Sequence, residues 1–253
     1  MSRSNPTLKT PHPSTRWFEW KGGDNSGLQY YDKEKKETVP VALPFTFLLL
    51  EETGGVVGYN KKLKTGIRSN EIQQGGTLVV KYGNGATFAS GHWMDIKDKV
   101  KGAGGKFSSN IYLAYKDGSE LKIGVLRASG CALGPWFDFT KANREMVISP
   151  FDGKTELARI YSGAVVMKAG KLDESGAVAF TPSTFAMVAC SQESNLAALA
   201  LSAKVDKYLA EYFKRAPMDD PESHEDPEPE SEPEQEPEPD PLEPAPDDDS
   251  LPF

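Results

Sequence analysis

The sequence predicts a mostly β protein of the α+β class, with one long helix near the C-terminal end and a disordered acidic tail after it. Short apolar and aromatic runs separated by glycine-containing turns indicate strands joined by hairpins. Residues 191–215 follow the helical period instead. From Pro217 onward the chain has 16 Asp or Glu, 11 Pro and no Lys or Arg, a composition that cannot offset the entropy of ordering.

The elements before the long helix are expected in the following order. Residues 1–15 are polar, contain three prolines and are expected to form a flexible arm. Three turns are interpreted as hairpins: Gly54-Gly55, Gly83-Asn84-Gly85 and Lys116-Asp117-Gly118. Strand-like runs cover 16–21, 28–33, 39–50, 56–59, 78–82, 86–89, 110–115, 121–126, 157–167 and 177–188. In the run 39–50, Pro40 and Pro44 confine its start to an edge or a bend.

Two helices are predicted. A short one covers 92–101, because Trp93, Ile96 and Val100 fall on one face. The long one covers 191–215, with Ser191 as its N-cap and basic residues in its last turn, as the helix dipole favours. Its expected apolar face consists of Leu196, Leu199, Ala200, Ala203, Tyr208, Leu209 and Tyr212.

Charge divides the chain into two parts of opposite sign. Residues 1–216 hold all 29 Lys and Arg against 21 Asp and Glu, which gives +8, whereas the tail over 217–253 carries −16. Residues 16–216 are therefore interpreted as one folded domain that includes the 191–215 helix, and 217–253 as an extended, self-repelling tail.

Enzymatic chemistry has little support in the sequence. The three histidines are isolated, and neither they nor Cys131 and Cys190 have metal-ligand spacing. The run 102–106, Gly-Ala-Gly-Gly-Lys, lacks the spacing of a phosphate-binding loop and is interpreted as a flexible basic loop. Ser129-Gly130-Cys131 is interpreted as a turn that enters a strand. We therefore expect no catalytic activity, no metal, no cofactor and no membrane span, and two thiols fit a reducing cytoplasm.

Cationic and aromatic side chains are interleaved along the body, as on a surface for single-stranded nucleic acid. Such strands are bound by cations that follow the phosphates and by rings on which bases stack. The candidate residues are Arg16, Trp17, Trp20, Lys21, Tyr30, Tyr31, Tyr59, Lys61, Lys62, Lys64, Arg68, Lys81, Tyr82 and Trp93. For each aromatic the alternative is a place in the core, and for each basic loop it is simple solvation.

The segment 247–253 reads Asp-Asp-Asp-Ser-Leu-Pro-Phe, three carboxylates followed by a short apolar plug. It resembles the acidic tip of bacterial and bacteriophage single-stranded DNA-binding proteins, the SSB family, which have a run of Asp followed by a hydrophobic residue, Pro and Phe. The approach to the tip is Pro/Glu-rich rather than Gly/Gln-rich, and the body differs from a standard bacterial SSB sequence. The resemblance is therefore to a divergent, bacteriophage-encoded member.

The resemblance implies an OB-like β-barrel with elaborations that binds and protects single-stranded DNA, without strong sequence preference, during replication, recombination and repair. It also implies that the tip recruits replication, recombination and repair proteins. Asp247, Asp248 and Asp249 would pair with a basic rim on the partner, while Leu251, Pro252 and Phe253 enter an apolar pocket. Family members often assemble, so the body could form a homo-oligomer, and the expected location is the cytoplasm of a bacterial host cell.

Two other functions stay open at this point. The chain could be an acidic-tailed interaction protein or nucleic-acid mimic in which the body is only a scaffold. It could also be a nuclease or other hydrolase with a partner-docking tail, which would need a carboxylate cluster for Mg²⁺ that the sequence does not display.

Overall fold

A computed structural model describes residues 10–23, 26–143, 145–148, 155–158, 163–174 and 179–214. The chain divides into two units, residues 1–221 and 222–253, and every described residue belongs to the first. The acidic tail and the tip over 247–253 therefore lie outside the described residues. Of the predicted arm, residues 10–15 are described, and there Thr15 donates its backbone N–H to the carbonyl oxygen of Ile123 at 2.8 Å.

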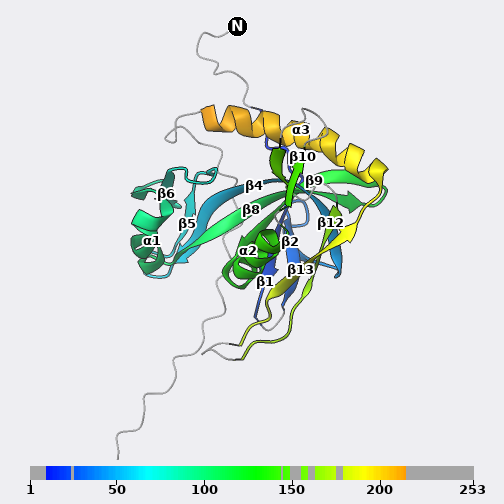
Figure 1. The fold of residues 1–253 in the computed structure, drawn as a ribbon. Helices are drawn as coiled ribbons and strands as arrows, with labels where there is room; N and C mark the ends of the chain where they lie inside the picture. The colour runs from blue at the N-terminus through cyan, green and yellow to red at the C-terminus, as the bar shows by residue number, and fades with distance from the viewer. Residues whose placement is uncertain are drawn as a thin grey trace, which may run out of the picture. The chain divides into compact units, whose positions relative to one another are not determined.

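The described part of the chain is mostly β, with a long helix at its C-terminal end (Figure 1). The strands are β1 (Arg16–Lys21), β2 (Gly27–Asp32), β3 (Glu37–Val41), β4 (Phe45–Asn60), β5 (Thr65–Ser69), β6 (Leu78–Tyr82), β7 (Thr87–Gly91), β8 (Gly105–Asp117), β9 (Glu120–Ser129), β10 (Glu145–Ile148), β11 (Thr155–Ala158), β12 (Gly163–Ala169) and β13 (Ser183–Ala189). The helices are α1 (Trp93–Gly102), α2 (Leu133–Ala142) and α3 (Gln192–Lys214), with a 3₁₀ turn at Gly130–Ala132 before α2.

The main sheet is open. Its strand order is β3-β2-β1-β9-β8-β4-β5-β6-β7; β12 also pairs with β4, and β13 pairs with β12. The β1–β9 pair is parallel, and the others within this sheet are antiparallel. In the described part of the chain β3 and β7 do not pair with each other, so the sheet does not close. The OB-like barrel expected from the resemblance is therefore not confirmed.

Two long strands connect the main sheet to a smaller extension. β4 and β8 pair from Phe47 opposite Tyr115 to Gly58 opposite Gly105, with a bulge between Leu49 and Glu51. Beyond the bulge, the same two strands continue into a lobe formed with β5, β6, β7 and α1 (Figure 1). We call residues 54–107 the extension, and we keep the name main sheet for the part of the sheet outside it.

The hairpin predicted at Gly54-Gly55 is wrong, because β4 runs straight through both glycines. A Cβ on Gly54 would lie 2.9 Å from Cζ of Phe107 and 3.3 Å from Cγ1 of Ile72. The absence of a side chain at Gly54 therefore makes room for side chains that pack across the strand. Glycine within a β run can thus indicate close packing and not only a turn.

The two faces of the sheet are covered by different helices. α2 packs Trp136 and Phe139 on one face, against Phe18, Phe45 and other residues of the main core. On the same face of the extension, α1 places Ile96 and Val100 on a separate apolar cluster. The opposite face of the main sheet is covered by α3, whose Val205 and Leu209 contact a third cluster. The extension therefore has one face under α1, whereas α3 packs on the main sheet and reaches the extension through Tyr212.

The prediction of α3 is confirmed in extent but wrong for three of the seven residues of its expected apolar face. Ser191 caps it, since its Oγ accepts the Ser194 backbone N–H at 3.2 Å. Leu196 is 59 % exposed, and the alanines at 200 and 203 are exposed too. The buried face is instead Ala198, Ser202, Val205, Tyr208 and Leu209. The sequence did not determine which side of the first half of α3 faces the core, because several neighbouring residues are alanines, which are tolerated on either face.

The region before and within α2 also differs from expectation. Ser129-Gly130-Cys131 leads into the 3₁₀ turn and α2, so the prediction of a turn entering a strand is wrong. α2 contains Gly134 and Pro135, which masked its helical pattern in the sequence.

The short helix predicted over 92–101 is confirmed by α1, with Ile96 and Val100 buried. The hairpins predicted at 83–85 and 116–118 are confirmed by the β6–β7 and β8–β9 pairs.

Candidate nucleic-acid interface

Most of the net positive charge of residues 1–216 lies in the extension. Residues 54–107 contain nine Lys or Arg and three Asp or Glu, a net charge of +6 out of the +8 of residues 1–216. Residues 1–53 are neutral and residues 108–216 carry only +2. An anionic ligand is therefore attracted to one lobe rather than to the body as a whole.

Sheet register places three of these cations in a line across the extension. Lys106 on β8 is opposite Val57 on β4, Val57 is opposite Arg68 on β5, and Arg68 is opposite Lys81 on β6. Residues directly opposite in a sheet point to the same face, so Lys106, Arg68 and Lys81 share one. This face is opposite to the one that α1 covers, because Val56 and Ile67, which pack with α1, alternate with Val57 and Arg68.

The β4–β5 turn adds further cations at the end of the same lobe. Lys61, Lys62 and Lys64 are all exposed in this turn, and Leu63 between them is 60 % exposed. Tyr59, two residues after Val57 and thus on the same face, is 38 % exposed. We call this surface the basic face, defined by Tyr59, Lys61, Lys62, Lys64, Arg68, Lys81 and Lys106.

The basic face has free space above it and no carboxylate partners among the described residues. A Cβ on Gly66, which lies opposite Tyr59, would meet nothing within 4 Å. None of the cations of the basic face is within 4.0 Å of a carboxylate in the part of the chain that the structure describes. Arg68 and Lys81 are direct cross-strand neighbours of like charge, an arrangement that costs folding free energy.

A hydrogen-bond network around Glu71 fixes the segment beside the basic face. Thr53 and Tyr112 donate hydroxyl hydrogens to the Glu71 carboxylate, at 2.6 Å for Thr53 and 3.0–3.1 Å for Tyr112. The Glu71 backbone N–H donates to the Tyr212 hydroxyl of α3 at 2.8 Å. Burial, helped by the charge of Glu71, raises the pKa of Tyr112 well above its ordinary value. The hydroxyl therefore stays protonated and remains a donor.

Other sequence-predicted binding residues are engaged within the fold. Trp20 is 8 % exposed and donates its indole N–H to the Thr181 carbonyl oxygen at 2.8 Å. The Arg16 guanidinium pairs with Asp117 at 3.0 Å and lies 4.5 Å from the centroid of the Tyr30 ring.

Trp17 is also covered, since the Arg127 guanidinium lies 5.0 Å from its ring centroid and His12 packs beside it. Lys21 is exposed at the end of β1, and Tyr31 is half-buried on β2. These residues and Tyr30 belong to the main sheet, so the structure does not bring them together with the basic face.

Asp117 pairs with two cations of the main sheet. Lys122 donates to it at 2.8 Å and Arg16 at 3.0 Å. The hydrogen bond from Lys122 is the largest cause that lowers the pKa of Asp117, with Arg16 adding to it against a smaller opposing effect of burial. Arg16 and Lys122 thus have a carboxylate partner, whereas the cations of the basic face have none within the part of the chain that the structure describes.

Tyr82 and Trp93 lie on the α1 side of the extension. Tyr82 stacks on Phe88 with ring centroids 4.2 Å apart, and Trp93 packs against Phe107 with centroids 5.2 Å apart.

Lys106 was not among the residues predicted from the sequence, because the segment 102–106 was interpreted as a flexible loop. This interpretation is wrong: a Cβ on Gly104 would lie 2.3 Å from the Tyr59 carbonyl oxygen, so the segment is a tight turn packed on β4. Lys106 then follows as the first outward position of β8.

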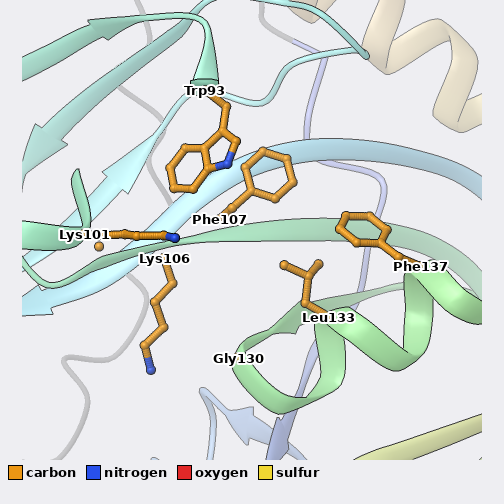
Figure 2. A pocket seen from close by; sticks show the side chains of 8 residues that line it. Trp93, Lys101, Lys106, Phe107, Gly130, Leu133 and Phe137 are labelled. Carbon is orange, nitrogen blue, oxygen red and sulfur yellow. The ribbon is translucent and has the colours of Figure 1, made fainter. Parts of the chain in front are cut away.

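A pocket of about 450 Å³ opens between α1 and α2. Its lining is mostly apolar and aromatic, and Figure 2 shows the side chains of Trp93, Phe107, Leu133 and Phe137 around one space. We call it the aromatic pocket; its lining residues are Trp93, Lys101, Gly105, Lys106, Phe107, Gly130, Leu133 and Phe137. In Figure 2 the Lys106 side chain points away from the Trp93 and Phe107 rings.

Within the described residues no group of three or more His, Cys, Asp or Glu is arranged to hold a metal ion. No helix in that same part of the chain is long and apolar enough to cross a membrane. Comparisons with protein-family models, with curated proteins and with solved structures each found no match to this chain.

Proposed function

We propose that this protein binds single-stranded DNA through the basic face of the extension, and that the segment 247–253 recruits partner proteins. The observation that carries the first part is the line of Lys106, Arg68 and Lys81 across the sheet, on a face with open space above Gly66. A line of cations that has no carboxylate partner among the described residues suits a chain of phosphates.

The cost of this arrangement supports the proposal. Arg68 and Lys81 repel each other in the free protein, and a bound phosphate would offset the repulsion. Relief of this repulsion would therefore add to the affinity for a polyanion. Folding alone gives no reason to place two cations opposite each other.

Exposed rings next to these cations favour a single strand over a duplex. Tyr59 borders the basic face, and Phe137 of the aromatic pocket is 44 % exposed. Aromatic rings stack on the faces of unpaired bases, which a duplex keeps within its own stack. Every base has such a face, so this mode gives little sequence preference. The sheet is open, so the OB barrel implied by the resemblance is not part of this proposal.

The recruiting role of the segment 247–253 rests on its sequence. Three adjacent carboxylates followed by Ser-Leu-Pro-Phe combine charge for a basic rim with an apolar side chain for a pocket. Proline restricts the conformations of the free segment and so reduces the entropy lost when a partner orders it. The expected partners are proteins of DNA replication, recombination and repair.

A fluorescence-anisotropy titration of the full chain tests the first part. The ligands are labelled oligo-dT, a duplex and an RNA of the same length, each at two salt concentrations. We expect tight binding to oligo-dT that weakens with salt, and much weaker binding to the duplex. The titration with RNA measures whether the protein distinguishes ribose from deoxyribose. Failure to bind oligo-dT at low salt would refute the proposal and favour an acidic-tailed interaction protein with a scaffold body.

A further inference from the structure

We propose that the aromatic pocket is a subsite for an unpaired base of the strand whose phosphates lie on the basic face. This inference rests on the proposed function and extends it to a site that the sequence analysis did not identify beyond Trp93. A pocket of about 450 Å³ lies within the usual size range of small-molecule sites and has room for a nucleobase.

The rings of the pocket are arranged to hold a flat, apolar surface. Trp93 and Phe107 pack with centroids 5.2 Å apart and planes tilted by 46°, so their outer faces form a bent wall. Phe137 and Leu133 come from α2 on the other side, and Phe137 is 44 % exposed despite its size. A base inserted between the two helices would cover apolar surface that the described part of the chain leaves open.

Charge at the pocket fits a phosphate next to that base. Among the described residues that line it, the titratable ones are the lysines Lys101 and Lys106, and none is a carboxylate. Lys106 also terminates the cation line of the basic face. The basic face and the pocket lie on opposite faces of the sheet, but among the described strands β8 is an edge at Lys106, because β9 pairs with it only from Ser108 onward. A strand that passes from Lys81 over Arg68 to Lys106 would round this edge to reach the pocket, where its next base can turn inward.

The lining also predicts how the base is recognised. Apart from the two lysines, the described side chains that line the pocket are aromatic or aliphatic, and none of them has an amide or hydroxyl to read a base edge. The base would be bound by its face, so this subsite should add affinity without a strong preference between bases. An acidic peptide with an apolar side chain is the competing occupant, and the test separates the two.

The main test compares Phe137→Ala with wild type in the full chain, using oligo-dT and an abasic oligonucleotide of equal length. Phe137 is exposed enough that its removal should not impair folding. We expect Phe137→Ala to weaken oligo-dT binding about five- to 150-fold, the range for one lost stacking contact. Binding of the abasic oligonucleotide should be the same for both proteins, and the salt dependence should be unchanged because no charge is removed.

The matched control is Met94→Ala. Met94 is 67 % exposed on α1 directly after Trp93 but does not line the pocket, so its truncation should leave both affinities unchanged. If Phe137→Ala binds oligo-dT as wild type does, or loses equal affinity for the abasic strand, the base subsite is refuted while binding by the basic face stands. If wild type binds no single strand at all, the proposed function itself fails and this inference with it.

Tryptophan fluorescence provides an independent readout. A base stacked on Trp93 should quench its emission, so oligo-dT should quench the wild type and much less the Trp93→Phe variant. Trp17→Phe is the control, because Trp17 lies under Arg127, outside the pocket, and its variant should keep the quenching. Quenching of Trp93 by an acidic, phenylalanine-containing peptide and not by oligo-dT would overturn the inference in favour of a peptide site.

Discussion

Replacing Arg68, Lys81 and Lys106 together with glutamine removes the cation line of the basic face while keeping much of each side chain's length. For single strands, log K falls with log salt by about 0.7 for each phosphate contact, so three lost contacts should flatten the slope by about 2. At 0.1 M salt the same relation predicts an affinity loss of about 100-fold.

The assay is a series of oligo-dT titrations at four or more salt concentrations. The control is a second triple variant, Lys33→Gln, Lys35→Gln and Lys36→Gln, in the exposed β2–β3 turn of the main sheet. It removes the same formal charge away from the basic face, so its slope should stay close to that of wild type. If both variants flatten the slope equally, only the total charge matters, and the reasoning from the cation line is refuted.

Thermal unfolding supplies a second, independent criterion. Arg68 and Lys81 are opposite each other in the sheet and repel, so neutralising either one should stabilise the fold by roughly 0.2–1 kcal/mol. For a protein of this size, that corresponds to a rise in melting temperature of up to about 4 °C. Lower DNA affinity combined with unchanged or higher stability would identify residues that serve binding, whereas a clear loss of stability would show that they serve folding.

Three further predictions concern other parts of the chain. Gly58→Ala would place a Cβ 2.3 Å from a backbone carbonyl oxygen and should cost about 1–3 kcal/mol in urea unfolding, whereas Gly66→Ala, with nothing within 4 Å, should cost far less. The hydrogen bond from Lys122 keeps the pKa of Asp117 below 3.8, so its stabilising effect is present above that pH and is lost as pH falls through the lowered pKa. The stability difference between wild type and Asp117→Asn should therefore be seen at pH 7 and shrink in acid; a constant difference would contradict this. Deleting Leu251–Phe253 should leave oligo-dT affinity within about twofold and abolish capture of repair proteins from a cell extract, and a large loss of affinity would contradict the division of labour.

The sequence predicted those elements whose signals are local. Two hairpins followed from Gly83-Asn84-Gly85 and Lys116-Asp117-Gly118, and α3 followed from its length and from Ser191 as cap. For each aromatic the sequence left a place in the core open as the alternative, and the structure buries Trp20, a candidate binding residue, in the main core with Phe18.

Elements that depend on distant partners could not be predicted in the same way. Gly54-Gly55 has the composition of a turn, but both glycines pair with Ser109 and Ser108 of β8, more than fifty residues away, and so the chain stays extended there. The site shows the same limit. Lys61, Lys62 and Lys64 were recognisable as a basic loop, but the alignment of Arg68 with Lys81 and Lys106 depends on sheet register.

The shared strands β4 and β8 have a consequence for how the molecule opens. Because both run unbroken from the main sheet into the extension, the lobe with the basic face cannot separate without breaking a ladder that also supports the main core. Amide hydrogens of β4 on both sides of Gly54 should then exchange with solvent at similar rates, as members of one cooperative unit. A ligand held on the extension would accordingly slow exchange in the main sheet, far from any atom that it touches.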